Sequence, residues 1–180
     1  MKTAVLNVLA ICLFAGPARA DLEYAFHVTS ASGALQPFSF SFTSPTFLAD
    51  TDVPTITPFT VTNGVDSFTF TQGLATTQNG VGCFEFGTAA GSILGTCNVG
   101  DDNSPGAAAL LLQLGGPLPT APGVYGLPVG LLTEDLTVIF GLTGSLDITS
   151  VPEPASIGLL AIVLAVAGWK LSRRYAPRTS

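Results

Sequence analysis

The sequence is 180 residues long and has a formal net charge of −6, but its charges are unevenly distributed. All six lysine and arginine residues lie before residue 21 or after residue 169, whereas eleven of the twelve acidic residues lie between 21 and 150. That interval has a charge near −11 and no base, which excludes a nucleic-acid-binding domain because phosphate contacts require lysine and arginine. Its length of about 130 residues predicts a single domain.

The first 20 residues have the parts of a secretory signal peptide. Lys2 is followed by an apolar stretch over residues 4–15. Small residues then occupy the positions up to Ala20 that signal peptidase reads. We therefore predict export by the Sec machinery and cleavage between Ala20 and Asp21. The alternatives are an uncleaved anchor, disfavoured by the short apolar run, and a lipid anchor at Cys12, disfavoured by the bulky residue before it.

Alternation of apolar and polar residues predicts strands along most of the interval 21–150. The apolar positions are rich in phenylalanine, so they should form the core. Asn63-Gly64 predicts a hairpin turn, and Gly144 interrupts the last stripe, where we expect a bulge or bend. The alternating segments lie at residues 22–28, 38–43, 59–62, 67–71, 84–86 and 136–148.

Several short antiparallel strands predict a mainly β, sandwich-like domain, with a partly open barrel as the alternative. Two segments are less clear. Residues 107–114 are apolar throughout and fit either a buried strand or a short helix. Residues 115–130 contain four prolines and predict an irregular loop.

Two cysteines, Cys83 and Cys97, remain once the signal peptide is removed. An even pair in an exported chain predicts a disulfide, with two buried free thiols or intermolecular pairing as the alternatives. In the chain-entropy description, closing a loop of about 15 residues contributes about 3 kcal/mol to stability.

Candidates for catalysis are few. His27 is the only histidine and alternates with apolar neighbours, so we expect it on the exposed face of a strand; no G-x-S-x-G elbow accompanies it. Glu134 and Asp135 would point to opposite faces of a strand, and we expect them to start one. Asp101 and Asp102 are weak candidates for a Ca²⁺ site, because aspartates in loops also form turns. We expect neither enzyme activity nor a cofactor.

The last 30 residues form a second targeting pattern. Pro152, Glu153 and Pro154 precede an apolar run that predicts a transmembrane helix over about residues 155–171. The prolines hold the chain around the acidic residue in a stiff, extended form. The apolar run spans roughly 22 Å as a helix, less than the ~30 Å hydrocarbon core, so basic residues behind it can reach lipid headgroups. These basic residues are Lys170, Arg173, Arg174 and Arg178.

A Pro-Glu-Pro triplet, a short apolar helix and an arginine pair near the chain end together resemble the PEP-CTERM sorting signal. The resemblance is confined to about residues 151–175. It implies processing by an exosortase, a membrane transpeptidase-like enzyme of Gram-negative bacteria that make exopolysaccharide. The expected partners are this enzyme, the export machinery with signal peptidase, membrane lipid and exopolysaccharide.

The predicted organisation is therefore a signal peptide over residues 1–20, an exported β-rich domain over 21–150 and a sorting tail over 151–180. We expect an intermediate that is anchored in the inner membrane with its domain in the periplasm. Its final location would be the cell surface or extracellular matrix of a Gram-negative bacterium, as a non-catalytic envelope or matrix protein. The alternatives are a carbohydrate- or calcium-binding surface module and a permanently anchored single-pass protein.

Overall fold

A computed structural model describes residues 20–30, 35–62, 65–88, 95, 97, 107–134 and 137–152 of the chain. Residues Leu22–Ser150 form one unit. The described residues contain nine strands and no helix, which confirms the prediction of a mainly β domain. Seven strands form a single sheet in the order β2-β1-β9-β8-β7-β6-β5, and β3 pairs with β4 in a separate hairpin.

The last two of the nine strands are the longest. Their bounds are β1 (Asp21–Ser30), β2 (Phe38–Ser44), β3 (Phe59–Thr62), β4 (Ser67–Phe70), β5 (Gln72–Gln78), β6 (Val81–Gly87), β7 (Ala108–Gln113), β8 (Gly123–Glu134) and β9 (Thr137–Val151). Strand β7 settles the open question about residues 107–114, because this apolar segment is a buried strand.

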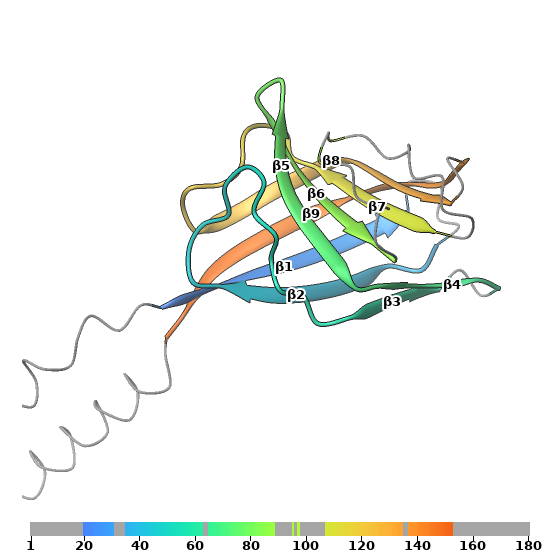
Figure 1. Ribbon diagram of the computed structural model, residues 1–180, viewed down its shortest axis with the longest axis horizontal. Coiled ribbons are helices and arrows are strands. Elements are labelled where there is room, and N and C mark those ends of the chain that lie inside the picture. Colours follow the sequence, from blue (N-terminus) through green and yellow to red (C-terminus); the bar gives the residue numbers. More distant parts are fainter. Residues whose placement is uncertain are drawn as a thin grey trace, which may run out of the picture. The chain divides into compact units, whose positions relative to one another are not determined.

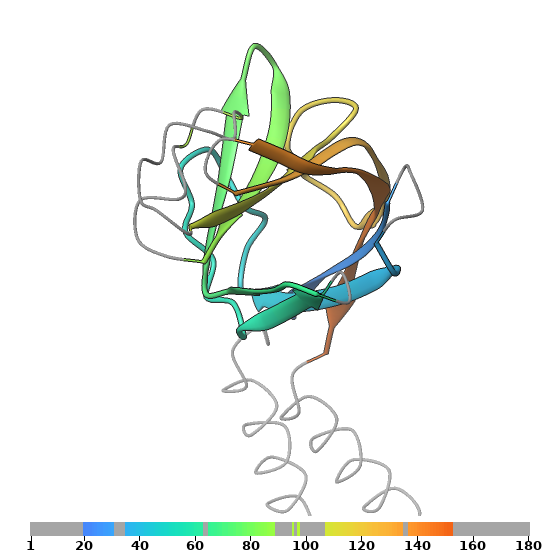
Figure 2. The ribbon, with the colours of Figure 1, turned by 90° about the vertical axis from the view of Figure 1, so that its right-hand side faces the viewer.

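The seven-stranded sheet curls around the core, as Figures 1 and 2 show. One continuous sheet therefore supplies both walls of the core, whereas the predicted sandwich would use two separate sheets packed face to face. The right-handed twist of long strands favours this curl, and bulges increase it locally. The pairing of β8 with β9 has two such irregularities, between Leu127 and Gly130 and between Leu132 and Thr133.

The prediction of an irregular loop over residues 115–130 is wrong for its second half. Strand β8 starts at Gly123 and pairs with both β7 and β9. Pro128 fits within β8 because it lies in the irregularity between Leu127 and Gly130, where the ladder to β9 is interrupted. The end of β8 also corrects a prediction, since Glu134 closes this strand and does not start one.

Aromatic rings from the alternating segments fill the core, as their spacing predicts. Phe26 on β1 lies opposite Phe40 on β2, with ring centroids 4.8 Å apart. Phe26 also meets the edge of Phe84 from β6, at 5.2 Å. Phe59 of the hairpin stacks on Phe40 at 3.8 Å, so ring contacts attach the hairpin to β2. Such pairs contribute about 0.5–1.5 kcal/mol each beyond the burial of their area.

The segment before the hairpin covers the outer edge of β5. The amide of Ala75 donates to the Asp52 carbonyl at 2.8 Å, and the amide of Thr77 donates to Asp50 Oδ1 at 2.7 Å. An edge whose donors are occupied in this way is protected from pairing with another chain. The amide of Leu48 donates to the buried Tyr24 hydroxyl at 2.9 Å, which fixes the same segment to the core. Burial raises the pKa of Tyr24.

Strand β9 lies inside the sheet, between β1 and β8. In Figure 1, β9 ends at the same end of the sheet at which β1 begins, so the chain enters and leaves the domain at one end. Gly144 permits the close approach of β9 to β1, because a Cβ at this position would collide with the His27 carbonyl oxygen. The ladder becomes irregular directly after the pair that Gly144 forms with Leu127, but the extra residues lie on β8 and not at Gly144.

We predict that Gly144→Ala destabilises the domain by about 1–3 kcal/mol or more, because the backbone of β1 must move away. Gly141→Ala on the same strand is the matched control, since nothing lies within 4 Å of its added Cβ. Urea unfolding of the exported protein measures both. Equal free energies of unfolding for the two variants would contradict the close approach of β1 and β9.

Candidate functional site

The described residues reach both predicted processing junctions. Ala20 is exposed and β1 begins at the next residue, Asp21. At the other end β9 runs to Val151, and Pro152 follows it directly and is exposed. The strands of the domain therefore extend from one predicted junction to the other, with no spacer before the Pro-Glu-Pro triplet.

The rest of the sorting tail lies outside the described residues. This applies to Glu153 and Pro154, to the helix predicted over residues 155–171, and to the basic residues Lys170, Arg173, Arg174 and Arg178. In the part of the chain that the structure describes, no helix has the length and apolar character needed to cross a membrane.

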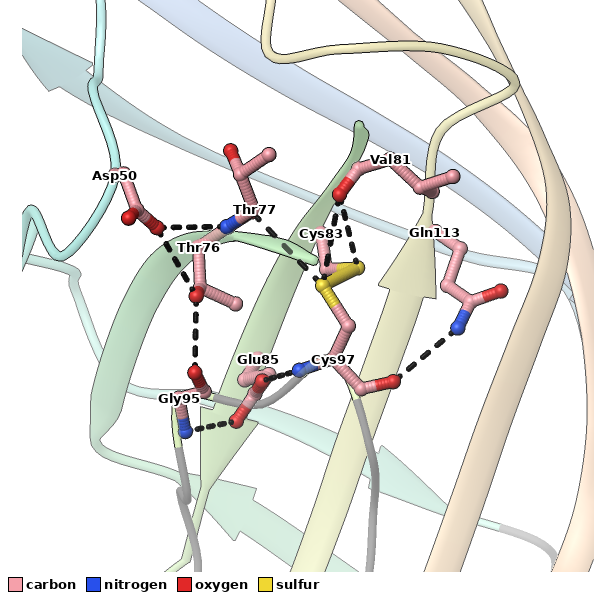
Figure 3. Close-up of a disulfide and its surroundings, with 9 residues drawn as sticks. All are labelled: Asp50, Thr76, Thr77, Val81, Cys83, Glu85, Gly95, Cys97 and Gln113. Atoms are coloured by element: carbon pink, nitrogen blue, oxygen red, sulfur yellow. Dashed lines mark hydrogen bonds between the residues drawn. A yellow bond between two sulfur atoms is a disulfide. The ribbon is translucent and has the colours of Figure 1, made fainter. Parts of the chain in front are cut away.

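The predicted disulfide between Cys83 and Cys97 is confirmed (Figure 3). Cys83 lies on β6, and both cysteines are buried. The two Cα atoms are 5.6 Å apart, within the usual range for a disulfide. Cys97 has a left-handed backbone with φ of 50°, a conformation that few non-glycine residues adopt. The bond therefore holds Cys97 against β6.

Glu85 lies beside the disulfide and is buried, with 3% of its surface exposed. Its two carboxylate oxygens accept hydrogen bonds from the amide of Cys97 at 2.8 Å and the amide of Gly95 at 3.0 Å. No lysine or arginine exists between residues 21 and 150, so amide donors take the place of a counterion. The Glu85 carboxylate and the disulfide together hold Gly95 and Cys97, here called the crossing segment, on the sheet.

Neighbouring polar groups bind the same segment (Figure 3). The Thr76 hydroxyl lies 3.0 Å from the Gly95 carbonyl and 3.2 Å from Asp50 Oδ1. Gln113 Nε2 donates to the Cys97 carbonyl at 3.2 Å. These side chains bind backbone atoms or one another, an arrangement that fixes a loop in place.

The sequence contained a signal for the buried carboxylate that our reasoning did not use. Cys83 and Glu85 are two positions apart on one strand, so they share a face. A disulfide from Cys83 must therefore bring the segment around Cys97 across that face, over the glutamate. The amide donors could not be anticipated, because they depend on the backbone path of the crossing segment.

The structure describes two of the remaining candidates for chemistry, His27 and Glu134. His27 is exposed on β1, and its Nδ1 lies 2.9 Å from the Ser39 hydroxyl. Glu134 is at the end of β8, and Asp101 and Asp102 lie outside the described residues. Among the residues that are described, no three histidine, cysteine or acidic side chains gather in a way that could hold a metal ion.

Residues 150–174 match the PEP-CTERM protein-sorting motif. The match includes the Pro-Glu-Pro triplet and ends at Arg174, which confirms the resemblance and its confinement to one segment. The motif implies export, passage through a membrane-anchored state and processing by an exosortase. It begins at Ser150, so its first two residues belong to β9. No curated protein and no solved structure matches this chain.

We predict that Glu85→Gln lowers the free energy of unfolding by about 1–3 kcal/mol, since an amide NH₂ then faces one of the buried N–H donors and leaves it unpaired. Glu23→Gln, on the less buried outer face of β1, is the control and should change stability little. Urea unfolding of both variants tests this; an unchanged Glu85→Gln protein would show that the amide contacts contribute nothing.

We also predict that Cys83→Ala combined with Cys97→Ala costs about 3 kcal/mol, because the unfolded chain regains the freedom of a loop of about 15 residues. The wild-type protein should show the same loss after treatment with a thiol reductant under unfolding conditions. Identical thermal midpoints with and without reductant would rule out a stabilising role for the bond.

Proposed function

We propose that this protein is a non-catalytic component of the cell envelope or extracellular matrix of a Gram-negative bacterium, delivered to its place by exosortase processing. The observation that carries the proposal is the sorting motif at residues 150–174, which begins where the last strand of the domain ends. The motif makes the chain a substrate of the processing enzyme.

The domain retains its whole sheet when the tail is removed. Strand β9 ends at Val151, so a cut after this residue takes no strand away. A cut upstream would remove part of an interior strand that is hydrogen-bonded on both sides. Processing on the C-terminal side of Val151 therefore agrees with release of a folded product.

The chain is in a different folding state at each of the two cleavages. Signal peptidase acts on the N-terminal junction during export, when the neighbours of β1 in the sheet, β2 and β9, follow later in the chain. The exosortase acts on a motif that is exported after every strand. The first cut thus occurs before the sheet forms, and the second occurs beside a completed sheet.

The surface chemistry supports a structural role outside the cytoplasm. Hydroxyl side chains line most of the exposed face near β2, where Ser39, Ser41 and Thr43 alternate with core residues and Glu23 of β1 lies opposite Thr43. Thr29 on β1 donates to the Thr143 carbonyl on β9, which continues this hydroxyl-rich face. Hydroxyl groups can both donate to and accept from sugars, which makes exopolysaccharide the partner that this face suits best.

We expect intact-mass measurement to find a mature chain that starts at Asp21, ends after Val151 and lacks the basic cluster. Production in a host with its exosortase gene and in a strain that lacks the gene provides the comparison. The deletion strain should accumulate the longer, membrane-bound form. A surface-located protein that still carries Arg178, or the same final product in both strains, contradicts the proposal.

A further inference from the structure

The absence of a spacer between the domain and its sorting motif has a geometric consequence. Pro152 follows the last residue of β9, so an enzyme that holds the triplet also touches the end of the sheet. Three residues of extended chain reach only about 10 Å, which is less than the width of a small domain. The end of β9 is therefore the part of the domain that is closest to the triplet along the chain.

An open cleft of about 570 Å³ lies at this end, beside the start of β8. Val124 on β8 is paired with Asp147 on β9. From Asp147 to Val151 there are four residues, or about 14 Å of strand. Asp147 and Val151 are an even number of residues apart on β9, so they lie on the same face of the sheet. Val124 lies on that face too, because it is paired with Asp147.

The cleft has no charged residue in its walls, although the domain carries eleven acids. Val124 is 72% exposed near the start of β8, in a regular part of its pairing with β9, where a polar side chain would be usual. Val151 is also exposed, at 38%. The apolar walls of the cleft come from Leu114, Pro117, Leu118, Val124, Tyr125 and Pro128.

Two hydrogen bonds made by residues of its walls hold the cleft in shape. The Tyr125 hydroxyl donates to the Ala121 carbonyl at 2.6 Å, which closes the segment before β8 on itself. The amide of Gly82 donates to the Gly116 carbonyl at 2.8 Å, which fixes the other side of the cleft to β6. A surface that is already in its final shape loses little conformational entropy on binding.

We propose that this cleft is the docking surface for the exosortase, so that the enzyme recognises the end of the folded domain together with the Pro-Glu-Pro motif. The inference rests on the proposed function, because it names a second contact for the same processing event. A membrane-embedded enzyme would present an uncharged, apolar segment here, since an acidic or basic one would leave its charge unpaired against these walls.

The test introduces a negative charge into the cleft of the full-length chain, by Val124→Asp on the strand and by Thr120→Asp on the exposed loop. Val65→Asp is the control, because Val65 is 90% exposed and precedes β4, at the far end of the sheet from the end of β9 in Figure 1. Pulse-chase labelling in a host with the exosortase measures the rate of conversion to the shorter form, and thermal unfolding of each variant confirms that it folds.

Both cleft variants should be processed about tenfold more slowly than the wild type, while Val65→Asp keeps the wild-type rate. A flexible Gly-Ser insertion between Val151 and Pro152 should abolish this difference, because the motif then reaches the enzyme without the cleft. Wild-type rates for two folded cleft variants overturn the docking surface and leave the proposed function intact. A wild-type chain that is never processed overturns both.

Discussion

The placement of the last strand between β1 and β8 is the constraint on which the rest of the structure depends. An interior strand must be present before its neighbours can complete their hydrogen bonds, so the sheet closes only when residues 137–151 are available. Gly144 permits this closure by leaving room for the carbonyl of His27. The sorting motif begins at Ser150, so it follows the sheet without a gap.

The absence of lysine and arginine between residues 21 and 150 determines how the domain is stabilised. Ion pairs with lysine or arginine cannot form within this interval, and the core relies on aromatic rings, with Phe26 and Phe40 stacked at 4.8 Å. Among the described residues Glu85 is the buried carboxylate, and two amides next to the disulfide donate to it. The acids give the interval 21–150 a net negative charge, which favours solubility.

The sequence predicted the elements better than their arrangement. Alternation located the strands that carry Phe26, Phe40 and Phe84, and cysteine parity predicted the disulfide, because these signals are local or compositional. The curl of the sheet and the pairing of β1 beside β9 depend on contacts between residues that are more than 100 positions apart in the sequence. A local sequence pattern contains no information about such contacts. Pro128 concealed the first half of β8, since proline normally excludes a strand except at a bulge.

Amide hydrogen exchange of the processed protein tests most directly whether β9 belongs to the domain up to the motif. The account predicts that amides of residues 142–148 exchange as slowly as those of β7 and β8, at rates set by global unfolding. Exchange of β9 as rapid as that of an exposed loop would contradict it, because the last strand would then belong to the tail and the domain would end before the sorting signal.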